Sequence, residues 1–270
     1  MSEIPLGRST EYSGEYDPAL LFAIGRSDAR AVSGIGPQLP FRGTDIWNAW
    51  ELTWLDISGK PIVATAVIAI DAASPNIIES KSLKLYLNSL AMTRYQSSDE
   101  VAALIAKDLS GAAGDDVVVT VTPAADSTNI PISQLPGTCI DELDIVTVPG
   151  NVDASLLRCE NSAAVTEELH SHLLRSNCPV TNQPDMGSIL IRYGGPKIDR
   201  ESLLSYIVSY RLHNDFHEAC VERIFRDIKK HCSPMSLTVY ARYNRRGGLD
   251  INPFRTDTNE APDNLRLWRQ

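Results

Sequence analysis

Residues 47–70 read WNAWELTWLDISGKPIVATAVIAI, and this stretch decides the class of fold. Trp47 to Leu55 is rich in aromatic residues, and Pro61 to Ile70 is apolar and rich in β-branched residues. Ser58-Gly59 stands between them, and Ser and Gly are typical turn residues. Two apolar runs joined by such a turn predict an antiparallel β-hairpin.

The hairpin is followed by a change to helical spacing. Leucines recur every three or four residues from Leu83 to Leu90, which indicates a helix with one apolar face. A second amphipathic helix is predicted over 98–109, and the apolar run from Val117 to Val121 predicts another strand.

The second half of the chain repeats this order. We expect strands at 165–174 and 188–193, helices at 202–212 and 218–232, and final strands at 235–243 and 249–254. The two halves share little residue identity, so the repetition lies in the pattern of elements. It predicts an α+β fold with two antiparallel sheets, each carrying a pair of helices.

The chain length agrees with a division into two parts. At about 150 residues per domain, 270 residues make one large domain or two of ordinary size. The first forty residues are rich in Gly, Ser and Pro and show no sustained period, which is typical of an extended arm. We expect an N-terminal arm at 1–40, a first domain at 41–135, a linker at 136–160 and a second domain at 161–270.

Composition excludes several classes of function. The chain is 43% apolar and 22% charged, so it can bury a core, and its net charge of −9 disfavours a general nucleic-acid binder. The first residues do not resemble a signal peptide, and the longest apolar run is half the ~20 residues of a membrane-spanning helix. Five scattered cysteines form neither a disulfide framework nor a C-x-x-C zinc motif. We therefore expect a cytoplasmic protein with reduced thiols.

The first candidate for chemistry is the loop SNCPVTNQPD at 176–185. It is too polar and too rich in Pro for a core strand, so Cys178 is expected to be partly exposed, as reactive thiols are. Asp185 follows in the same loop and could carry a proton. The same residues fit a surface thiol beside an unrelated turn acid. Cys220 and Cys232 belong to an amphipathic helix, where burial as small apolar residues is the ordinary role.

Three further motifs could bind ligands. Residues 79–86 (ESKSLKLY) place an acid, hydroxyls and two lysines where a loop enters a helix, which suits a phosphate, although spacing alone favours a solubilising turn. In Phe216-His217-Glu218 the acid could cap the last helix or accept two N–H donors from a guanine-like edge. Residues 245–248 (RRGG) form either a solvated hairpin tip or a close approach to phosphate.

These motifs together resemble one family. Residues 79–86, the loop holding Cys178 and Asp185, Phe216-His217-Glu218 and the run RRGGLDINPFR at 245–255 are similar, in that order, to motifs of the QueF-type nitrile reductases in their long two-domain form. The family belongs to the tunnelling-fold (T-fold) group. The resemblance therefore implies tandem T-fold domains, each an antiparallel sheet with a pair of helices.

The resemblance also implies an activity. It is the NADPH-dependent, four-electron reduction of 7-cyano-7-deazaguanine to 7-aminomethyl-7-deazaguanine, in the biosynthesis of the tRNA base queuosine. Cys178 would add to the nitrile carbon and form a covalent thioimide, and Asp185 would supply the proton that the nitrogen gains. The residues implied in substrate binding are Ile77, Ile78, Glu79, Phe216, His217 and Glu218. Those implied in cofactor binding, from both domains, are Ser80, Lys81, Arg246 and Gly247.

The implied partners are few. A small-molecule substrate, NADPH as co-substrate and a second copy of the chain in a homodimer are expected, with no metal, no direct nucleic acid and no membrane. Two other functions stay open on the residues alone. A zinc-dependent GTP cyclohydrolase would need clustered Cys and His ligands beside the nucleophile, and a non-catalytic purine or pterin binding module would have no use for Cys178 with Asp185.

Overall fold

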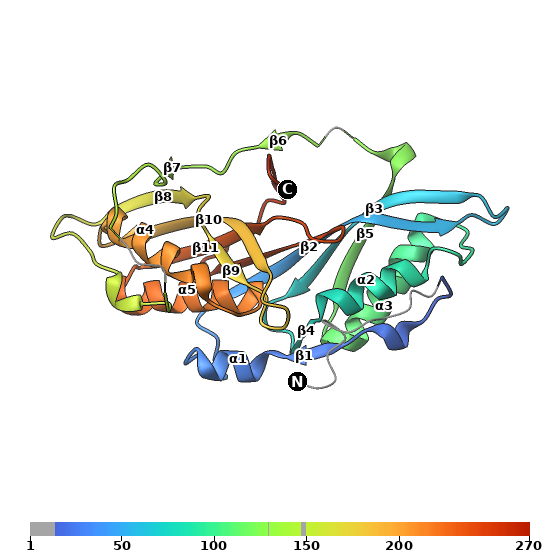
Figure 1. Ribbon diagram of the computed structural model, residues 1–270, viewed down its shortest axis with the longest axis horizontal. Helices are drawn as coiled ribbons and strands as arrows, with labels where there is room; N and C mark the ends of the chain where they lie inside the picture. Colours follow the sequence, from blue (N-terminus) through green and yellow to red (C-terminus); the bar gives the residue numbers. More distant parts are fainter. Residues whose placement is uncertain (1–13, 129, 147–149) are drawn as a thin grey trace. The chain divides into compact units, whose positions relative to one another are not determined.

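A computed structural model describes residues 14–128, 130–146 and 150–270, drawn as a ribbon in Figure 1. Contacts divide the chain into two compact units. Unit 1 comprises the chain up to Asp28 with Asp45–Ile130 and Arg245–Ile251, and unit 2 comprises Ala29–Thr44, Pro131–Asn244 and Asn252–Gln270. Parts of the expected arm (1–13) and of the expected linker (147–149) lie outside the described residues.

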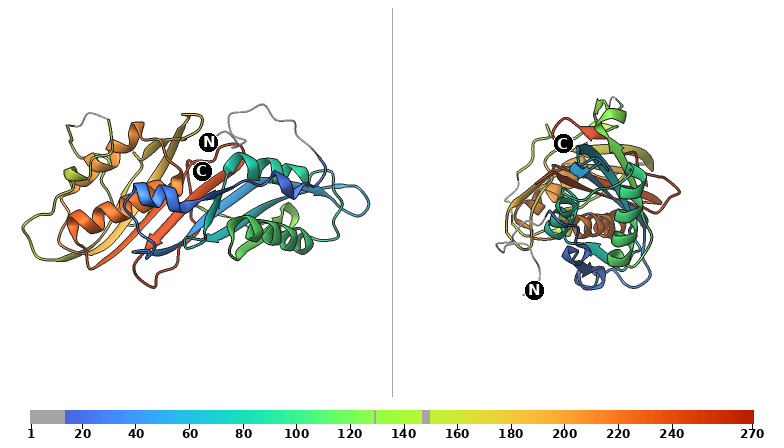
Figure 2. Two further views of the ribbon diagram at one scale, coloured as in Figure 1. Left: turned by 90° about the horizontal axis from the view of Figure 1, so that it is seen from below. Right: turned by 90° about the vertical axis from the view of Figure 1, so that its right-hand side faces the viewer.

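Unit 1 is built on the predicted hairpin. Its elements are η1 (Pro18–Leu20), β1 (Ala23–Gly25), most of β2 (Arg42–Leu55), β3 (Pro61–Asp71), β4 (Asn76–Ile78), α2 (Ser80–Ser89), α3 (Ser98–Ala113), β5 (Val117–Pro123) and η2 (Ala124–Asp126). Strands β5, β3 and β2 are neighbours in that order, and β3 and β5 are antiparallel, with Ile68 opposite Val119. Figure 2 shows α2 and α3 on one face of these strands.

The core of unit 1 follows from two periodicities. Along β3 every second residue from Ala64 to Ile70 is buried, because successive side chains of a strand point to opposite faces. The helices supply the facing layer, with Leu83 and Tyr86 from α2 and Ile105 from α3. The Tyr86 hydroxyl donates to the Asp108 carboxylate at 2.7 Å, so this buried phenol keeps a hydrogen bond.

Unit 2 holds the second set of strands and helices. Its elements are β6 (Ile132–Ser133), β7 (Thr138–Cys139), η3 (Ala154–Leu156), β8 (Val165–Ser171), β9 (Arg175–Asn177), β10 (Pro184–Gly195), α4 (Arg200–Val208), η4 (Ser209–Leu212), α5 (His217–Cys232), β11 (Ser236–Tyr243), part of β12 (Leu249–Thr256) and β13 (Arg266–Leu267). Strands β12, β11, β10, β8 and β7 are neighbours in that order, and β9 also pairs with β10. Helix α5 packs on β11.

The expected α+β class, with antiparallel strand pairs and helices on the sheet, is confirmed. Three details differ. Within the expected arm, β1 pairs with β4 (Ile24 opposite Ile77) and Arg26–Val32 form α1, elements too short to show a period. The expected loop at 176–185 contains the last residues of β9 and the first residues of β10. Residues 245–251 fall in unit 1, because the start of β12 lies beside β2.

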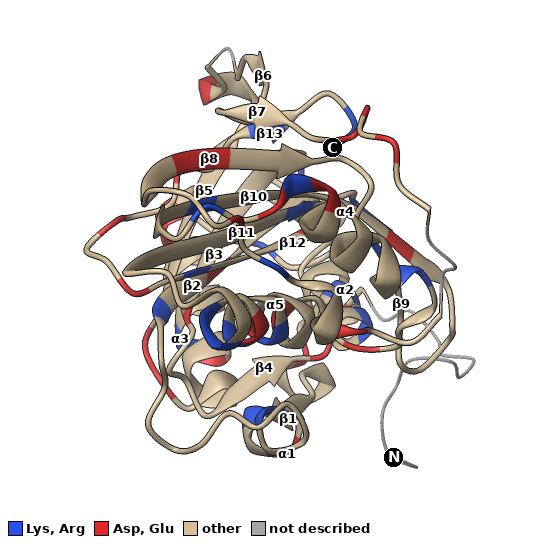
Figure 3. Cartoon of the chain, turned by 90° about the vertical axis from the view of Figure 1, so that its left-hand side faces the viewer, with Lys and Arg blue, Asp and Glu red and all other residues tan. Residues whose placement is uncertain are grey.

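Among the described residues, none of the helices is long and apolar enough to cross a membrane. Figure 3 shows Lys and Arg interleaved with Asp and Glu over the elements in view, α5 included.

Candidate active site

The loop between β9 and β10 holds Cys178 in a closed hairpin of unit 2. The Cys178 N–H donates to the Gln183 carbonyl at 2.8 Å, and the Asn182 N–H donates back to the Cys178 carbonyl at 3.0 Å. The side-chain amide of Asn214 also approaches that carbonyl, at 3.4 Å. Cys178 is only 3% exposed. The expectation of a partly exposed thiol is therefore wrong, because the loop folds back on itself and is covered by the segment before α5.

Asp185 lies in the same hairpin, on β10. It pairs with Ser176 across the β9–β10 ladder, two residues before Cys178, and is 8% exposed. Its carboxylate Oδ2 lies 3.4 Å from Nε2 of His217, the first residue of α5. The His217 ring stacks on Tyr243 with centroids 3.7 Å apart and planes 3° from parallel. An acid and an imidazole are thus held together by rigid elements, as a proton-transfer pair requires.

Several buried polar atoms near this pair have no hydrogen-bond partner among the described residues. They are the Nδ1 atom of His217, the side-chain oxygen of Asn177 and the hydroxyl of Thr181. Buried polar atoms in folded proteins are nearly always satisfied, so a group of unsatisfied ones calls for a ligand or water. Asn177 and Thr181 belong to the same hairpin as Cys178, so these unsatisfied atoms mark the hairpin and the start of α5 as a place where a ligand could bind.

The motif Phe216-His217-Glu218 opens α5, as predicted. Phe216 is the N-cap residue and makes no side-chain capping bond, and Glu218 lies buried in the first turn. From the sequence, Glu218 was a possible cap of this helix. In the structure the N-cap position is held by Phe216, whose side chain makes no capping bond. A carboxylate in the first turn is stabilised by the helix dipole.

Two other cysteines of unit 2 are poor nucleophiles. Burial raises the pKa of Cys220 well above its usual value. Burial also raises the pKa of Cys232 to about 12, and the neighbouring Cys159 adds to this effect. Since the thiolate is the reactive form, both thiols stay protonated and inert near neutral pH.

In unit 1, Glu79 forms the start of α2. It is fully buried, and its two carboxylate oxygens accept the N–H groups of Lys81 and Ser82, each at 2.8 Å. These bonds make Glu79 the N-cap of the helix. The preceding Ile77 and Ile78 are buried as well, and Ser80 and Lys81 are half-buried at the helix start.

Arg246 and Gly247 belong to unit 1, together with Ser80 and Lys81, and not to the second domain as expected. Gly247 and Gly248 form a tight turn with φ of +60° and +76°, closed by the Arg246 N–H donating to Leu249. Both glycines line a cavity of about 230 Å³. The other residues lining it are Ala49, Glu51, Thr53, Lys84, Leu87, Asn88 and Leu249.

Lys84 was counted among the lysines of the 79–86 motif but was not assigned to the cofactor site from the sequence, and in this sense it was missed. A side chain built on Gly247 would meet the Lys84 carbons at 3.2 Å, so this lysine lies directly against the turn. The signal was present, since Lys84 is one helical turn after Lys81 and shares its face. Tyr243 and Asn214 were missed as well, and neither carried a sequence signal because their contacts with the site are tertiary.

Two family models and several full-length relatives match this chain. The family model described as "Nitrile reductase, 7-cyano-7-deazaguanine-reductase N-term" matches residues 12–121, and that described as "QueF-like protein" matches 184–262. A protein of Paraburkholderia xenovorans named NADPH-dependent 7-cyano-7-deazaguanine reductase is 53% identical over 268 residues, which is 98% of each chain. Proteins of the same name from Paraburkholderia phymatum and Burkholderia orbicola are 52% and 53% identical, again over 98% of each chain.

This chain belongs to the nitrile reductase family. The resemblance seen in its motifs is confirmed, and so is the expected class of enzyme, an oxidoreductase. The ranges matched by the two family models include every candidate residue except Cys178, which lies six residues before the second range (184 − 178). A solved structure titled "Crystal structure of the archaeosine synthase QueF-Like in the apo form" aligns with a TM-score of 0.32 and 17% identity, over 38% of this chain and all of that one. That similarity is too low to bear on the fold.

Proposed function

We propose that this chain reduces the nitrile of 7-cyano-7-deazaguanine to the aminomethyl group of 7-aminomethyl-7-deazaguanine with NADPH. The names of its full-length relatives support the reaction. One observation supports the mechanism above others. The closed hairpin holds a buried thiol, Cys178, and a buried acid, Asp185, in one local structure.

Cys178 is the proposed nucleophile. Its sulfur forms a bond to the nitrile carbon while one C–N π bond opens, which gives a covalent thioimide. The thiol loses its proton and the nitrogen gains one, and Asp185 carries that proton between them. NADPH supplies the hydrides, two in all, for a four-electron reduction. After the first hydride transfer and before the second, the carbon–sulfur bond breaks, which releases an imine and restores the thiol of Cys178.

The His217–Asp185 contact supports the proton-carrying role. Stacking on Tyr243 fixes the plane of the imidazole ring, and its Nε2 lies 3.4 Å from the Asp185 carboxylate while the buried Nδ1 has no partner among the described residues. Phe216, His217 and Glu218 are proposed to hold the deazaguanine from unit 2. A buried carboxylate such as Glu218 can accept two N–H donors from the purine-like edge.

In unit 1, Ile77, Ile78 and Glu79 are proposed to contribute to substrate binding. Because both oxygens of Glu79 already accept backbone N–H groups, further donors must use their remaining lone pairs.

The cofactor is proposed to bind at the turn beside α2. A lysine ammonium, exposed backbone at Gly247 and a cavity of about 230 Å³ fit a phosphate-and-ribose portion of the cofactor. Ser80, Lys81, Arg246 and Gly247 keep their proposed part in this site, to which Lys84 is added. The carboxylate of Glu51 in the same cavity suits ribose hydroxyls better than phosphate.

We further propose that the reaction uses no metal, that the chain acts as a cytoplasmic homodimer, and that its product is used in queuosine biosynthesis. The reaction itself is tested by following NADPH absorbance with a measured amount of the nitrile. Two NADPH consumed per nitrile, with the primary amine as product, is the expected result. Binding of the nitrile without NADPH oxidation would instead support a non-catalytic purine binding module.

A further inference from the structure

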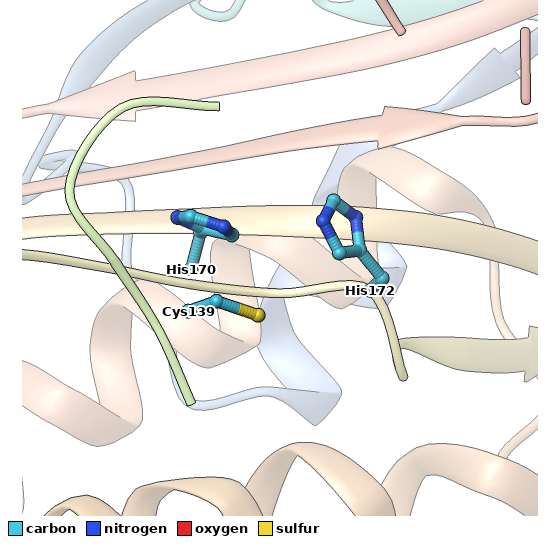
Figure 4. A group of neighbouring side chains, drawn as sticks. All are labelled: Cys139, His170 and His172. Atoms are coloured by element: carbon cyan, nitrogen blue, oxygen red, sulfur yellow. The ribbon is translucent and has the colours of Figure 1, made fainter. Parts of the chain in front are cut away.

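Outside the proposed active site, three potential metal ligands converge in unit 2. Cys139 on β7 and His170 on β8 are direct partners across a parallel strand pair, and His172 is two residues further along the chain. Register partners share a face of a sheet, so Cys139 and His170 lie on the same side, and His172, just after the end of β8, places its ring 5.3 Å from that of His170 (centroid to centroid). One ligand atom from each of the three residues lies within 4.8 Å of the others. Figure 4 shows the three side chains turned toward one another.

In each imidazole of the cluster, one ring nitrogen already has a hydrogen-bond partner. The Nδ1 atom of His170 lies 2.9 Å from the Pro136 carbonyl, which can only accept, so Nδ1 carries the proton and Nε2 keeps its lone pair. The Nδ1 atom of His172 lies 2.8 Å from the Ser188 hydroxyl, which leaves its Nε2 for a ligand too. A hydrogen bond from the second ring nitrogen to a carbonyl or hydroxyl is the usual support of a metal-bound histidine.

We propose that Cys139, His170 and His172 bind a zinc ion, with the fourth position open to solvent. One thiolate and two imidazoles suit the borderline-soft Zn²⁺ better than Mg²⁺ or Ca²⁺, which prefer oxygen. Tetrahedral zinc at its usual bond lengths places such ligand atoms about 3.4–3.6 Å apart. To bring the ligand atoms from 4.8 Å to this separation, they must move by about 1 Å, which rotation of the exposed Cys139 and half-buried His172 side chains allows.

One carboxylate and one guanidinium lie beside the cluster. The Asp141 carboxylate accepts from the Ser171 hydroxyl at 2.6 Å and from the His172 N–H at 3.0 Å, so an anion is anchored beside the ligands. The Arg269 guanidinium lies on the other side and donates to the His172 carbonyl at 2.9 Å. A bound thiolate would therefore offset one charge of the ion, and the Asp141 carboxylate would offset the charge of Arg269, which leaves one net positive charge at the site.

The consequence of the ion is structural. Strand β7 has only two residues, and only Thr138 and Cys139 pair with β8. A zinc ion joining Cys139 to His170 and His172 would fasten this short strand to the sheet. The ligands come from positions 139 and 170–172, so the spacing rules for zinc motifs do not detect them. The site is separate from Cys178 and takes no part in the proposed reaction.

The test uses the full chain after chelator treatment and dialysis. Titration with Co²⁺, a spectroscopic substitute for Zn²⁺, should give the visible bands of tetrahedral cobalt and a thiolate-to-cobalt charge-transfer band, saturating at one equivalent. Cys139→Ser should abolish the charge-transfer band. His172→Gln should weaken Zn²⁺ binding by about 100-fold or more, since even changes around the ligands cost about 10–100-fold.

Two matched variants keep this test specific. Cys159→Ser removes another exposed cysteine of unit 2, and Cys178→Ser removes the proposed nucleophile. Both should bind one Co²⁺ as the unaltered chain does. Metal-free Cys139→Ser should keep the melting temperature and NADPH-dependent activity of the metal-free unaltered chain, and Zn²⁺ should raise the melting temperature of the unaltered chain alone. Failure of the unaltered chain to bind one saturable equivalent would overturn the proposal. So would a charge-transfer band that survives in Cys139→Ser and disappears in Cys178→Ser.

Discussion

Replacing Asp185 by Asn separates the proposed proton carrier from a residue that only shapes its hairpin. Asn keeps the size of Asp185 and can still bond to His217, 3.4 Å away, but it cannot supply a proton. A positioned acid contributes about 10²–10⁴-fold in rate. We expect thioimide formation to slow by that factor, while the nitrile still binds noncovalently. Since the contact with His217 is weakened and not removed, the free energy of unfolding should fall by no more than one hydrogen bond contributes, about 0.5–1.5 kcal/mol.

The assay combines two measurements on the same sample, single-turnover adduct formation by quenched mass spectrometry and thermal unfolding. Asp215→Asn is the matched control, because Asp215 also faces a histidine (His213, 3.5 Å) in unit 2 without a proposed catalytic role. The control should form the adduct at a near-normal rate. A destabilised Asp185→Asn protein that forms the adduct as fast as the unaltered chain would refute the proton-carrying role.

Three further predictions concern unit 1. Lys81→Ala or Arg246→Ala should weaken NADPH binding but leave covalent capture of the nitrile intact. If Arg246→Ala blocks adduct formation while the affinity for NADPH is unchanged, Arg246 does not belong to the cofactor site. Gly248→Ala should destabilise the chain by about 1–2 kcal/mol, because φ is +76° there and the new methyl group would meet Glu51. Gly111→Ala, where the methyl group has open space within α3, should stabilise the chain by about 0.5–1 kcal/mol. Equal melting temperatures for the two variants would contradict the prediction. Burial, and then the hydrogen bond to the Asp108 carboxylate, raise the pKa of Tyr86, so the folded state holds the phenol proton more tightly than the unfolded state does. The contribution of this phenol to the free energy of unfolding is complete below its unfolded pKa of about 10 and falls as the pH rises above that value. Tyr86→Phe should therefore flatten the alkaline part of a plot of unfolding free energy against pH.

The sequence predicted the long elements well and the short ones poorly. The hairpin of β2 and β3 and the two helix pairs were visible because many residues share one period. Strand β1 and helix α1 have three and seven residues, too few for a period to stand out. Residues 245–251 could not be placed in unit 1 from the sequence, because their place beside β2 depends on pairing between segments about 200 residues apart.

For the site, the sequence identified residues and the structure added their surroundings. The motif around Cys178 was recognisable, but the burial of its thiol was not, because the loop is closed by a hydrogen bond from Cys178 to Gln183 and by one from Asn214 to Cys178. The stacking of His217 on Tyr243 joins α5 to β11, and a linear pattern gives no sign of such a contact. Ligands brought together only by the fold, such as Cys139 and His170, are beyond spacing rules for the same reason.

The central claim is that Cys178 attacks the nitrile, and an intact-mass spectrum tests it most directly. Addition of a thiol to a nitrile retains every atom, so mixing the chain with 7-cyano-7-deazaguanine without NADPH should raise its mass by one whole substrate. Cys178→Ala should abolish this shift, and Cys159→Ala, which removes an exposed cysteine of the same unit, should keep it. A full shift that persists in Cys178→Ala, with the label on another cysteine, would contradict the account.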